Sequence, residues 1–146
     1  MKEYEQYVKQ IENVLRNTEI AILATQDNDL IHARAMCLVN DGLKVYMQTD
    51  KTFNKVAEIQ KNENVALNVG AYNFIGKAKI VGEPKGNTWF LEEFKKKHLK
   101  SYEKYTNLPN EVLIEIDLTE CRIWSKTMVV INFLDKTVKQ IAYDVM

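Results

Sequence analysis

Apolar and polar residues recur along the chain with two different spacings, and the change from one to the other predicts its elements. From Glu3 to Asn17 the apolar residues share one helical face and the charged residues the opposite face, which predicts an amphipathic helix. Further helical patterns follow Thr52 and cover Asn87 to Tyr105. Alternating residues or short apolar runs predict six or seven strands, in the segments Ile20 to Thr25, Leu30 to Val39, Leu43 to Thr49, Asn64 to Ala71, Asn73 to Glu83, Val112 to Trp124 and Met128 to Phe133.

Short turns between the first strands predict antiparallel pairing. Asp27-Asn28-Asp29 separates the first strand from the second, and Asn40-Asp41-Gly42 separates the second from the third. Because Asp-Gly between alternating segments is typical of a hairpin, we expect Leu43 to Thr49 to pair with Ile31 to Val39 and the three strands to form a meander. Six or seven mostly antiparallel strands with flanking helices predict a mainly β fold of the α+β class, a small barrel rather than a doubly wound parallel sheet.

Length, charge and cysteine content limit the classes of function. The 146 residues predict a single domain, 1–146. Twenty acidic and twenty basic residues cancel, so no overall field attracts nucleic acid or an anionic membrane, and we expect neither as a partner. The N-terminus lacks the apolar core of a signal peptide and no apolar run is long enough to span a membrane, which predicts a cytoplasmic protein. Cys37 and Cys121 have no partner at metal-ligand spacing, so we expect reduced thiols and no metal site.

The change from strand to helix after Thr49 is a candidate anion site. A helix that begins there offers free backbone N–H groups beside the hydroxyls of Thr49 and Thr52 and the cations of Lys51 and Lys55, which suits a phosphate. The same residues also fit an ordinary junction in which Thr52 caps the helix and the lysines point into water. Arg34 supports the first interpretation, because a charged residue within an apolar strand either reaches solvent or meets an anion.

The order of these features resembles a known family. The apolar strand AILAT is followed by Arg34-Ala35-Met36 on its hairpin partner, an Asp-Gly turn, Tyr46 to Thr49, Lys55 six residues after that threonine, and then KNENVAL. In this order the chain resembles the pyridoxamine 5′-phosphate oxidase-like FMN-binding split barrels, and most of all their general-stress-protein branch. The resemblance is closest from Glu19 to Glu83, and it implies a split β-barrel that binds FMN at the interface of a homodimer.

The resemblance also implies which residues form the site. Arg34 and Lys55 correspond to the arginine and lysine that bind the flavin phosphate in the family. The residues implied to line the isoalloxazine ring are Ala35, Met36, Cys37, Gln48 and Thr49. Asn54 stands where the oxidase has a second cation, so Lys51 or Thr52 is expected to compensate. Trp124 corresponds to an aromatic residue that closes over the flavin from the partner subunit, or else is an ordinary core residue.

These correspondences imply an activity with the flavin as its reactive group. The tail beyond Trp124 has no arginine or histidine of the kind that holds pyridoxal phosphate in the true oxidase, so we do not expect oxidation of vitamin B6. The resemblance implies instead an FMN-dependent oxidoreductase or reductase that acts on a small molecule, with no catalytic residue assigned. The alternative is a non-catalytic sensor or storage dimer of the same fold that holds flavin, haem or F420.

Three other features have ordinary explanations beside functional ones. His32 shares a strand face with Arg34 and could donate a proton, but a lone strand histidine is more often hydrogen-bonded or exposed. The basic run before His98 could bind nucleic acid, yet glutamates flank it, which favours a solvated helix face. Glu115 and Asp117 could form a carboxylate pair, although two acidic residues two positions apart are also typical of the wet face of a strand.

Overall fold

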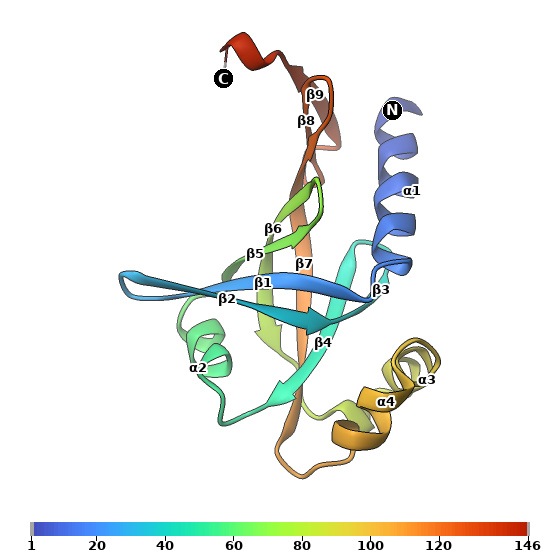
Figure 1. Ribbon diagram of the computed structural model, residues 1–146, viewed down its shortest axis with the longest axis vertical. Coiled ribbons are helices and arrows are strands. Elements are labelled where there is room, and N and C mark those ends of the chain that lie inside the picture. Colours follow the sequence, from blue (N-terminus) through green and yellow to red (C-terminus); the bar gives the residue numbers. More distant parts are fainter. Residues whose placement is uncertain (1, 146) are drawn as a thin grey trace.

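The computed structural model describes residues 2–145 (Figure 1). The helices are α1 (Lys2–Arg16), α2 (Asn54–Lys61), α3 (Thr88–Lys97) and α4 (Leu99–Ser101), with the short turns η1 (Pro84–Gly86), η2 (Tyr102–Thr106) and η3 (Tyr143–Val145). The strands are β1 (Ile20–Asp27), β2 (Leu30–Cys37), β3 (Val39–Asp41), β4 (Lys44–Asp50), β5 (Asn64–Val69), β6 (Tyr72–Ile80), β7 (Glu111–Trp124), β8 (Met128–Asn132) and β9 (Thr137–Ile141). Met1 and Met146, the two ends of the predicted domain, lie outside the described residues. None of the helices in the described range is long and apolar enough to cross a membrane.

The sheet is built on β7, whose 14 residues pair with β6 on one edge and with β4 and then β8 on the other. The strand order is β2-β1-β5-β6-β7-β4-β3, and β9 pairs with β8 beyond this path. Every pairing is antiparallel. In Figure 1 β1 and β2 run across the direction of β7, so the sheet curls back on itself. The predicted antiparallel split-barrel fold with flanking helices is confirmed, with nine strands among the described residues in place of six or seven.

The predicted meander is wrong, because the second strand ends before it reaches its expected partner. β2 stops at Cys37, the fully buried Leu38 packs into the core, and β3 begins at Val39. β3 forms the predicted hairpin with β4, but β4 pairs along its whole length with β7. β4 thus satisfies one edge with β7, and the edge of β2 that does not face β1 stays unpaired among the described strands. As a result β2 and β3 are the two ends of the sheet order, although one residue separates them in sequence.

The predicted helix over Asn87 to Tyr105 is broken at His98. Its start is ordinary, since the Asn87 side chain caps α3 by accepting a hydrogen bond of 2.9 Å from the Phe90 N–H. At His98 the backbone leaves the helical region (φ −133°, ψ 59°), and the ring donates from Nε2 to the carbonyl oxygen of Leu38 over 2.8 Å. The chain then continues as α4 and the π-helical turn η2. The break redirects this segment past β4.

Two apolar clusters hold the elements together. The larger fills the inside of the curled sheet under α1 and includes the fully buried Ile11, Leu15, Leu23, Met47 and Ile116. The smaller packs α3 against β3, β4 and β7, with Val39, Tyr46, Phe90, Phe94 and Leu113 as its members. Each large apolar side chain buried in this way contributes about 1.5–3 kcal/mol to folding. The smaller cluster matters for function because it fixes α3 beside the open edge of β4.

A β-bulge next to Gly76 bends β6 where it crosses β7. Ile75 lies opposite Glu120, but Gly76 lies opposite Leu118, so the register shifts by one residue. A Cβ atom at position 76 would lie 2.7 Å from the carbonyl oxygen of Asp117 and 2.9 Å from a methyl carbon of Ile116. Only glycine lets the two strands approach this closely.

Replacing Gly76 with alanine tests this close approach. Because the new methyl group meets backbone that cannot easily move, we expect Gly76→Ala to lower the free energy of unfolding by about 2 kcal/mol, within the range typical of overpacking. Gly86→Ala is the matched control, since a Cβ at Gly86 meets no atom within 4 Å. Urea unfolding followed by circular dichroism measures both variants, and equal losses of stability would contradict the role of Gly76.

Candidate functional site

The two strands that the sheet leaves apart, β2 and β4, border an opening in the barrel. Within the described residues β2 pairs with β1 alone, and β4 beyond Tyr46 pairs with β7 alone. The facing edges of both strands therefore carry backbone N–H and C=O groups that the sheet does not use. A cavity of about 210 Å³ lies between β2 and β4, with residues of α2 and of the segment from α3 to η2 in its wall.

This cavity brings together most of the residues that the sequence predicts for the site. Its lining consists of Ala35, Met36, Cys37, Gln48, Thr49, Phe53, Lys55, Phe94, Ser101, Tyr105 and Glu111. Ala35, Met36 and Cys37 come from β2, Gln48 and Thr49 from β4, and Lys55 from the first turn of α2. Because successive residues of a strand point to opposite faces, the cavity follows the open edge of β2 rather than one of its faces.

Two cations, Lys55 and Arg34, gather at one end of the site. Lys55 donates from Nζ to Thr49 Oγ1 over 2.9 Å, and Nζ lies 4.8 Å from the centre of the Phe53 ring. Arg34 is not in the lining itself and donates to Thr25 Oγ1 over 2.7 Å. Burial lowers the pKa of both cations, and the charge of Arg34 lowers the pKa of Lys55 further. Nearby carboxylates, chiefly Glu58 for Arg34 and Glu111 for Lys55, oppose this lowering without cancelling it, so an anion that binds beside the two cations stabilises both.

Glu58 of α2, which no sequence pattern indicates as a site residue, holds Arg34 in place. Its carboxylate is 4% exposed, lies 2.5 Å from His32 Nδ1, accepts from Thr25 Oγ1 over 2.9 Å and lies 3.9 Å from Arg34 Nη2. Burial alone raises the pKa of Glu58, but the hydrogen bonds from His32 and Thr25 and the charge of Arg34 together lower it. Thr25 and His32 are direct cross-strand partners, so one carboxylate fastens both strands of the β1–β2 hairpin to α2.

Thr52 lies outside the cavity lining. Its N–H and its hydroxyl both donate to Asp50 Oδ1, over 2.8 Å and 2.6 Å, so they form a turn between β4 and α2. Thr52 is not the N-cap residue either, because α2 begins one residue later than the capping interpretation requires. Phe53 occupies that position without a side-chain hydrogen bond. Lys51 is exposed and likewise absent from the lining.

Trp124 lies far from the cavity of its own chain. It is the last residue of β7, whereas Glu111, the first residue of that strand, lines the cavity. A strand of this length spans about 40 Å, so the two ends cannot share one pocket. The indole is 60% exposed and lies 5.9 Å from the Tyr143 ring, centre to centre. The prediction that Trp124 is a plain core residue is therefore wrong.

Five residues of the lining are not predicted from the sequence. Phe53 could have been found from its place directly before α2, beside Lys55. Ser101 and Tyr105 reach the cavity because the helical segment breaks at His98, which no sequence pattern indicates. Phe94 reaches it from the smaller apolar cluster, and Glu111 reaches it from the start of β7. Neither residue differs in pattern from its neighbours.

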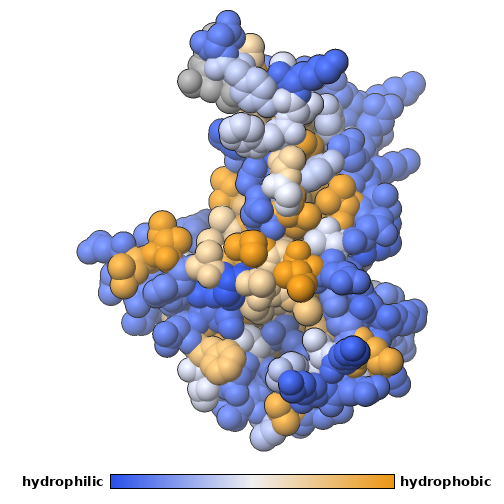
Figure 2. Space-filling view, in the orientation of Figure 1, coloured by the Kyte–Doolittle hydropathy of each residue, from blue (hydrophilic) through white to orange (hydrophobic). Residues whose placement is uncertain are grey.

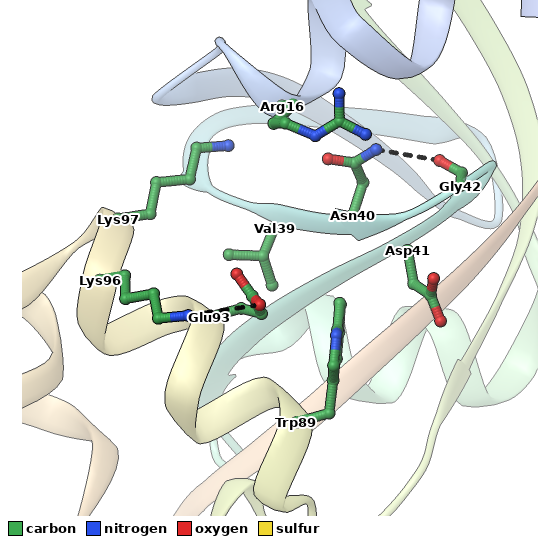
Figure 3. Close-up of a pocket in the computed structure, with 9 residues that line it drawn as sticks. All are labelled: Arg16, Val39, Asn40, Asp41, Gly42, Trp89, Glu93, Lys96 and Lys97. Atoms are coloured by element: carbon green, nitrogen blue, oxygen red, sulfur yellow. Dashed lines mark hydrogen bonds and ion pairs between the residues drawn. The ribbon is translucent and has the colours of Figure 1, made fainter. Parts of the chain in front are cut away.

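A second, larger cavity of about 350 Å³ lies between α1, the β3–β4 turn and α3 (Figure 3). Charged side chains from α1 and α3 surround it. Three of its charged side chains already have partners: Lys97 Nζ donates to the Leu15 carbonyl oxygen over 3.1 Å, and Lys96 Nζ lies 3.9 Å from Glu93. None of the residues predicted for the site lines it. The cavity between β2 and β4, which adjoins unused strand edges and is lined by most of the predicted residues, is therefore the candidate site.

Comparison with known proteins places the chain among relatives of this architecture. The family model described as pyridoxamine 5′-phosphate oxidase matches residues 7–125. General stress protein 26 of Bacillus subtilis (strain 168) is 31% identical over 131 residues, covering 82% of this chain and 89% of that protein. The crystal structure of General Stress Protein 26 from Bacillus anthracis str. Sterne has a TM-score of 0.65 at 21% identity, covering 93% of this chain and 99% of that one.

Other solved structures share the fold at lower identity. An F420 reductase has a TM-score of 0.58 at 21% identity, with coverage of 75% of this chain and 94% of that one. HutZ, the heme storage protein from Vibrio cholerae, has a TM-score of 0.62 at 10% identity, with coverage of 75% and 88%. The family match spans both edges of the opening and the helix between them. The chain belongs to the pyridoxamine 5′-phosphate oxidase family.

Proposed function

We propose that this protein is an FMN-binding flavoprotein, with Arg34 and Lys55 as the residues that hold the flavin phosphate. The observation that carries this proposal is Lys55 in the cavity wall and Arg34 on the adjoining strand β2, near enough for its charge to lower the pKa of Lys55, with burial lowering the pKa of both cations. A phosphate relieves their mutual repulsion and replaces the water that burial removes. Thr49, whose hydroxyl already accepts from Lys55, lies where it can donate to the same anion.

The remaining cavity residues are proposed to hold the ring system. The free edges of β2 and β4, at Ala35 to Cys37 and at Gln48 to Thr49, supply amide donors and carbonyl acceptors of the kind that a flavin pyrimidine requires. Met36 and the aromatic rings of Phe53, Phe94 and Tyr105 supply apolar contacts. When bound, the flavin supplies hydride or electron transfer, and the chain binds and orients it. On this basis the protein is an oxidoreductase that acts on a small molecule.

We further propose that two copies of the chain form the complete site. The cavity of one chain, about 210 Å³, is smaller than the roughly 300–1,000 Å³ of typical ligand pockets. An apolar surface adjoins it: Ile22, Ala24, Ala66 and Ile75 share the outward face of β1, β5 and β6, and Ile22 lies opposite Ala35. Figure 2 shows apolar side chains gathered over the middle of the sheet. We propose that Trp124, which is exposed and lies far from the cavity of its own chain, contributes to the site of the partner.

The alternative is a sensor or storage dimer that holds another ligand in the same cavity. F420 also carries a phosphate, which the same cations can bind, and the F420 reductase of the same fold keeps this possibility open. Haem fits less well. His98 donates to a backbone carbonyl and His32 is bound to Glu58, and neither of them lines the cavity. Visible spectra of the purified protein distinguish the three chromophores.

Removing either cation tests the phosphate contact. Because a hydrogen bond to a charged group contributes about 1.5–3 kcal/mol, we expect Arg34→Ala and Lys55→Ala each to weaken FMN binding by about ten- to a hundredfold. Riboflavin lacks the phosphate, so its affinity should change little in both variants. Fluorescence titration of both ligands measures the difference.

The matched control for this test is Lys51→Ala, which removes an exposed cation outside the cavity lining and should leave FMN binding unchanged. Wild-type protein that stays colourless and fails to retain added FMN after desalting would overturn the proposal. A loss of riboflavin binding equal to that of FMN would show that the two cations do not act on the phosphate.

A charge on the apolar face tests the dimer. Ile22 is 41% exposed and Ile75 46% exposed on the outward face of the sheet. Ile22→Lys and Ile75→Lys therefore place a charge where a partner should pack. Burying that charge in the interface is unfavourable, so we expect the two copies to separate. Light scattering after gel filtration should report a monomer for each variant and a dimer for the wild type. Leu134→Lys is the control, because Leu134 is 75% exposed in the β8–β9 turn. A dimer that survives both sheet substitutions would contradict this interface.

A further inference from the structure

A carboxylate at the start of β7 is buried beside the cavity without a partner. Glu111 is 6% exposed and lines the cavity. Its Oε2 atom has no hydrogen-bond partner among the described residues. A buried polar atom without a partner is rare in folded proteins, because it loses its bonds to water and gains none in return. The position of Glu111 in the cavity wall indicates where the missing partner can enter.

The charged groups around Glu111 do not neutralise it. Asp50 is its direct cross-strand partner on β4 and repels it, while the Asp50 carboxylate accepts from Thr52. Lys55 of α2 attracts it, but the Lys55 ammonium group donates to Thr49 instead. Burial raises the pKa of Glu111, Asp50 raises it further, and Lys55 opposes both effects. Cys37 of β2 and Tyr105 of η2 are the other titratable side chains in the same lining.

This arrangement is unfavourable for the protein on its own and favourable for a ligand. An ionised carboxylate only accepts hydrogen bonds, with two oxygens available. A hydroxyl or ring N–H group that enters the cavity beside Glu111 gives Oε2 the bond it lacks. Shifted carboxyl groups next to a cleft are typical of functional sites, where a destabilised group is stabilised by what binds there.

We propose that Glu111 contacts the ligand directly and that its carboxylate accepts a hydrogen bond from a hydroxyl or ring N–H group of the flavin nucleotide. This inference rests on the proposed function, in which the phosphate of the same molecule binds at Arg34 and Lys55. Glu111 is then the second polar anchor of the site, and it favours ligands that carry a hydrogen-bond donor, whereas Arg34 and Lys55 favour those that carry a phosphate.

The proposal gives binding a particular dependence on pH. Because the ionised carboxylate accepts a stronger hydrogen bond than the protonated acid does, ligand binding favours release of the Glu111 proton. Affinity is therefore constant above the raised pKa of Glu111 and falls as the pH decreases through it. An uncharged amide at this position has no proton to release, so it should abolish this dependence.

Fluorescence titrations with FMN and with riboflavin, each at a series of pH values, test this inference. We expect Glu111→Gln to weaken both ligands by about tenfold at high pH, the loss of one charge-assisted bond, and to remove the decline at low pH. The factor should be equal for FMN and riboflavin, since the contact does not involve the phosphate. Asp50→Asn removes the nearby like charge and should move the decline to lower pH without abolishing it.

Two controls separate a ligand contact from a structural role. Glu103→Gln removes an exposed negative charge from η2, outside the cavity lining, and should keep the wild-type profile. Thermal unfolding without ligand confirms that Glu111→Gln is folded. The folded wild type holds the Glu111 proton more tightly than the unfolded chain. Its stability should therefore fall as the pH rises from the ordinary value of 4.5 through the raised pKa, and the variant should lack this fall.

The outcomes distinguish this inference from the proposed function. Wild type that binds FMN, together with a folded Glu111→Gln variant that keeps both its affinity and its pH profile, would overturn the inference and leave the flavoprotein proposal standing. Wild type that binds neither FMN nor riboflavin would overturn both. A pH profile that moves with Asp50→Asn and disappears in Glu111→Gln supports the contact.

Discussion

The pairing of β4 with β7 decides where this protein can bind a ligand. Buried strands must satisfy their backbone hydrogen bonds, and β4 does so along one edge with β7. Its other edge is left to the short β3 and then to the opening. β2, joined to β3 through Leu38 alone, leaves the matching edge free on the other side. The barrel is thus closed by the covalent chain and not by a ladder of hydrogen bonds, and the cavity occupies the resulting gap.

Helix α2 supplies opposite charges to the two sides of this gap. Glu58 and Lys55 are three residues apart and so lie on the same side of the helix. Glu58 turns into the β1–β2 hairpin, where it binds His32 and Thr25 and attracts Arg34. Lys55 turns toward Thr49 in the cavity. A single short helix thereby fixes β2, the strand that bears Arg34. The same helix bears the second cation, Lys55.

The sequence reveals the elements better than it reveals their partners. The strands and helices fall close to the predicted segments, because the spacing of apolar residues depends only on nearby sequence. The hairpin turn at Gly42 forms as expected, with a φ of 60°. The sequence does not reveal that β4 pairs with β7, because a strand shows the same alternating pattern whether its antiparallel neighbour is near or far in the sequence. The pattern does not indicate the strand β9, because its residues are largely exposed and lack a clear apolar face.

The site residues likewise divide into those that the sequence reveals and those that it does not. Residues adjacent in sequence to a recognisable motif, such as Arg34 to Cys37 and Thr49 to Lys55, could be predicted because the motif includes them. Glu58 and Glu111 could not be predicted. The role of each carboxylate depends on its burial and on neighbours from other elements, which the local sequence does not show. The break at His98 depends on a hydrogen bond to Leu38, and so the approach of Tyr105 to the cavity depends on contacts between distant parts of the chain.

The central position of β7 also has a consequence for how the chain reaches this structure. β7 is encoded late, yet β4 and β6 both need it as a neighbour, and its pairs with β4 join residues as distant as Lys44 and Asp117. Such non-local pairings close only after a long loop has been ordered, which slows folding relative to a meander of the same size. During synthesis, β4 and β6 each keep an unpaired edge until the ribosome has released nearly the whole chain. In that interval these edges can pair with other chains.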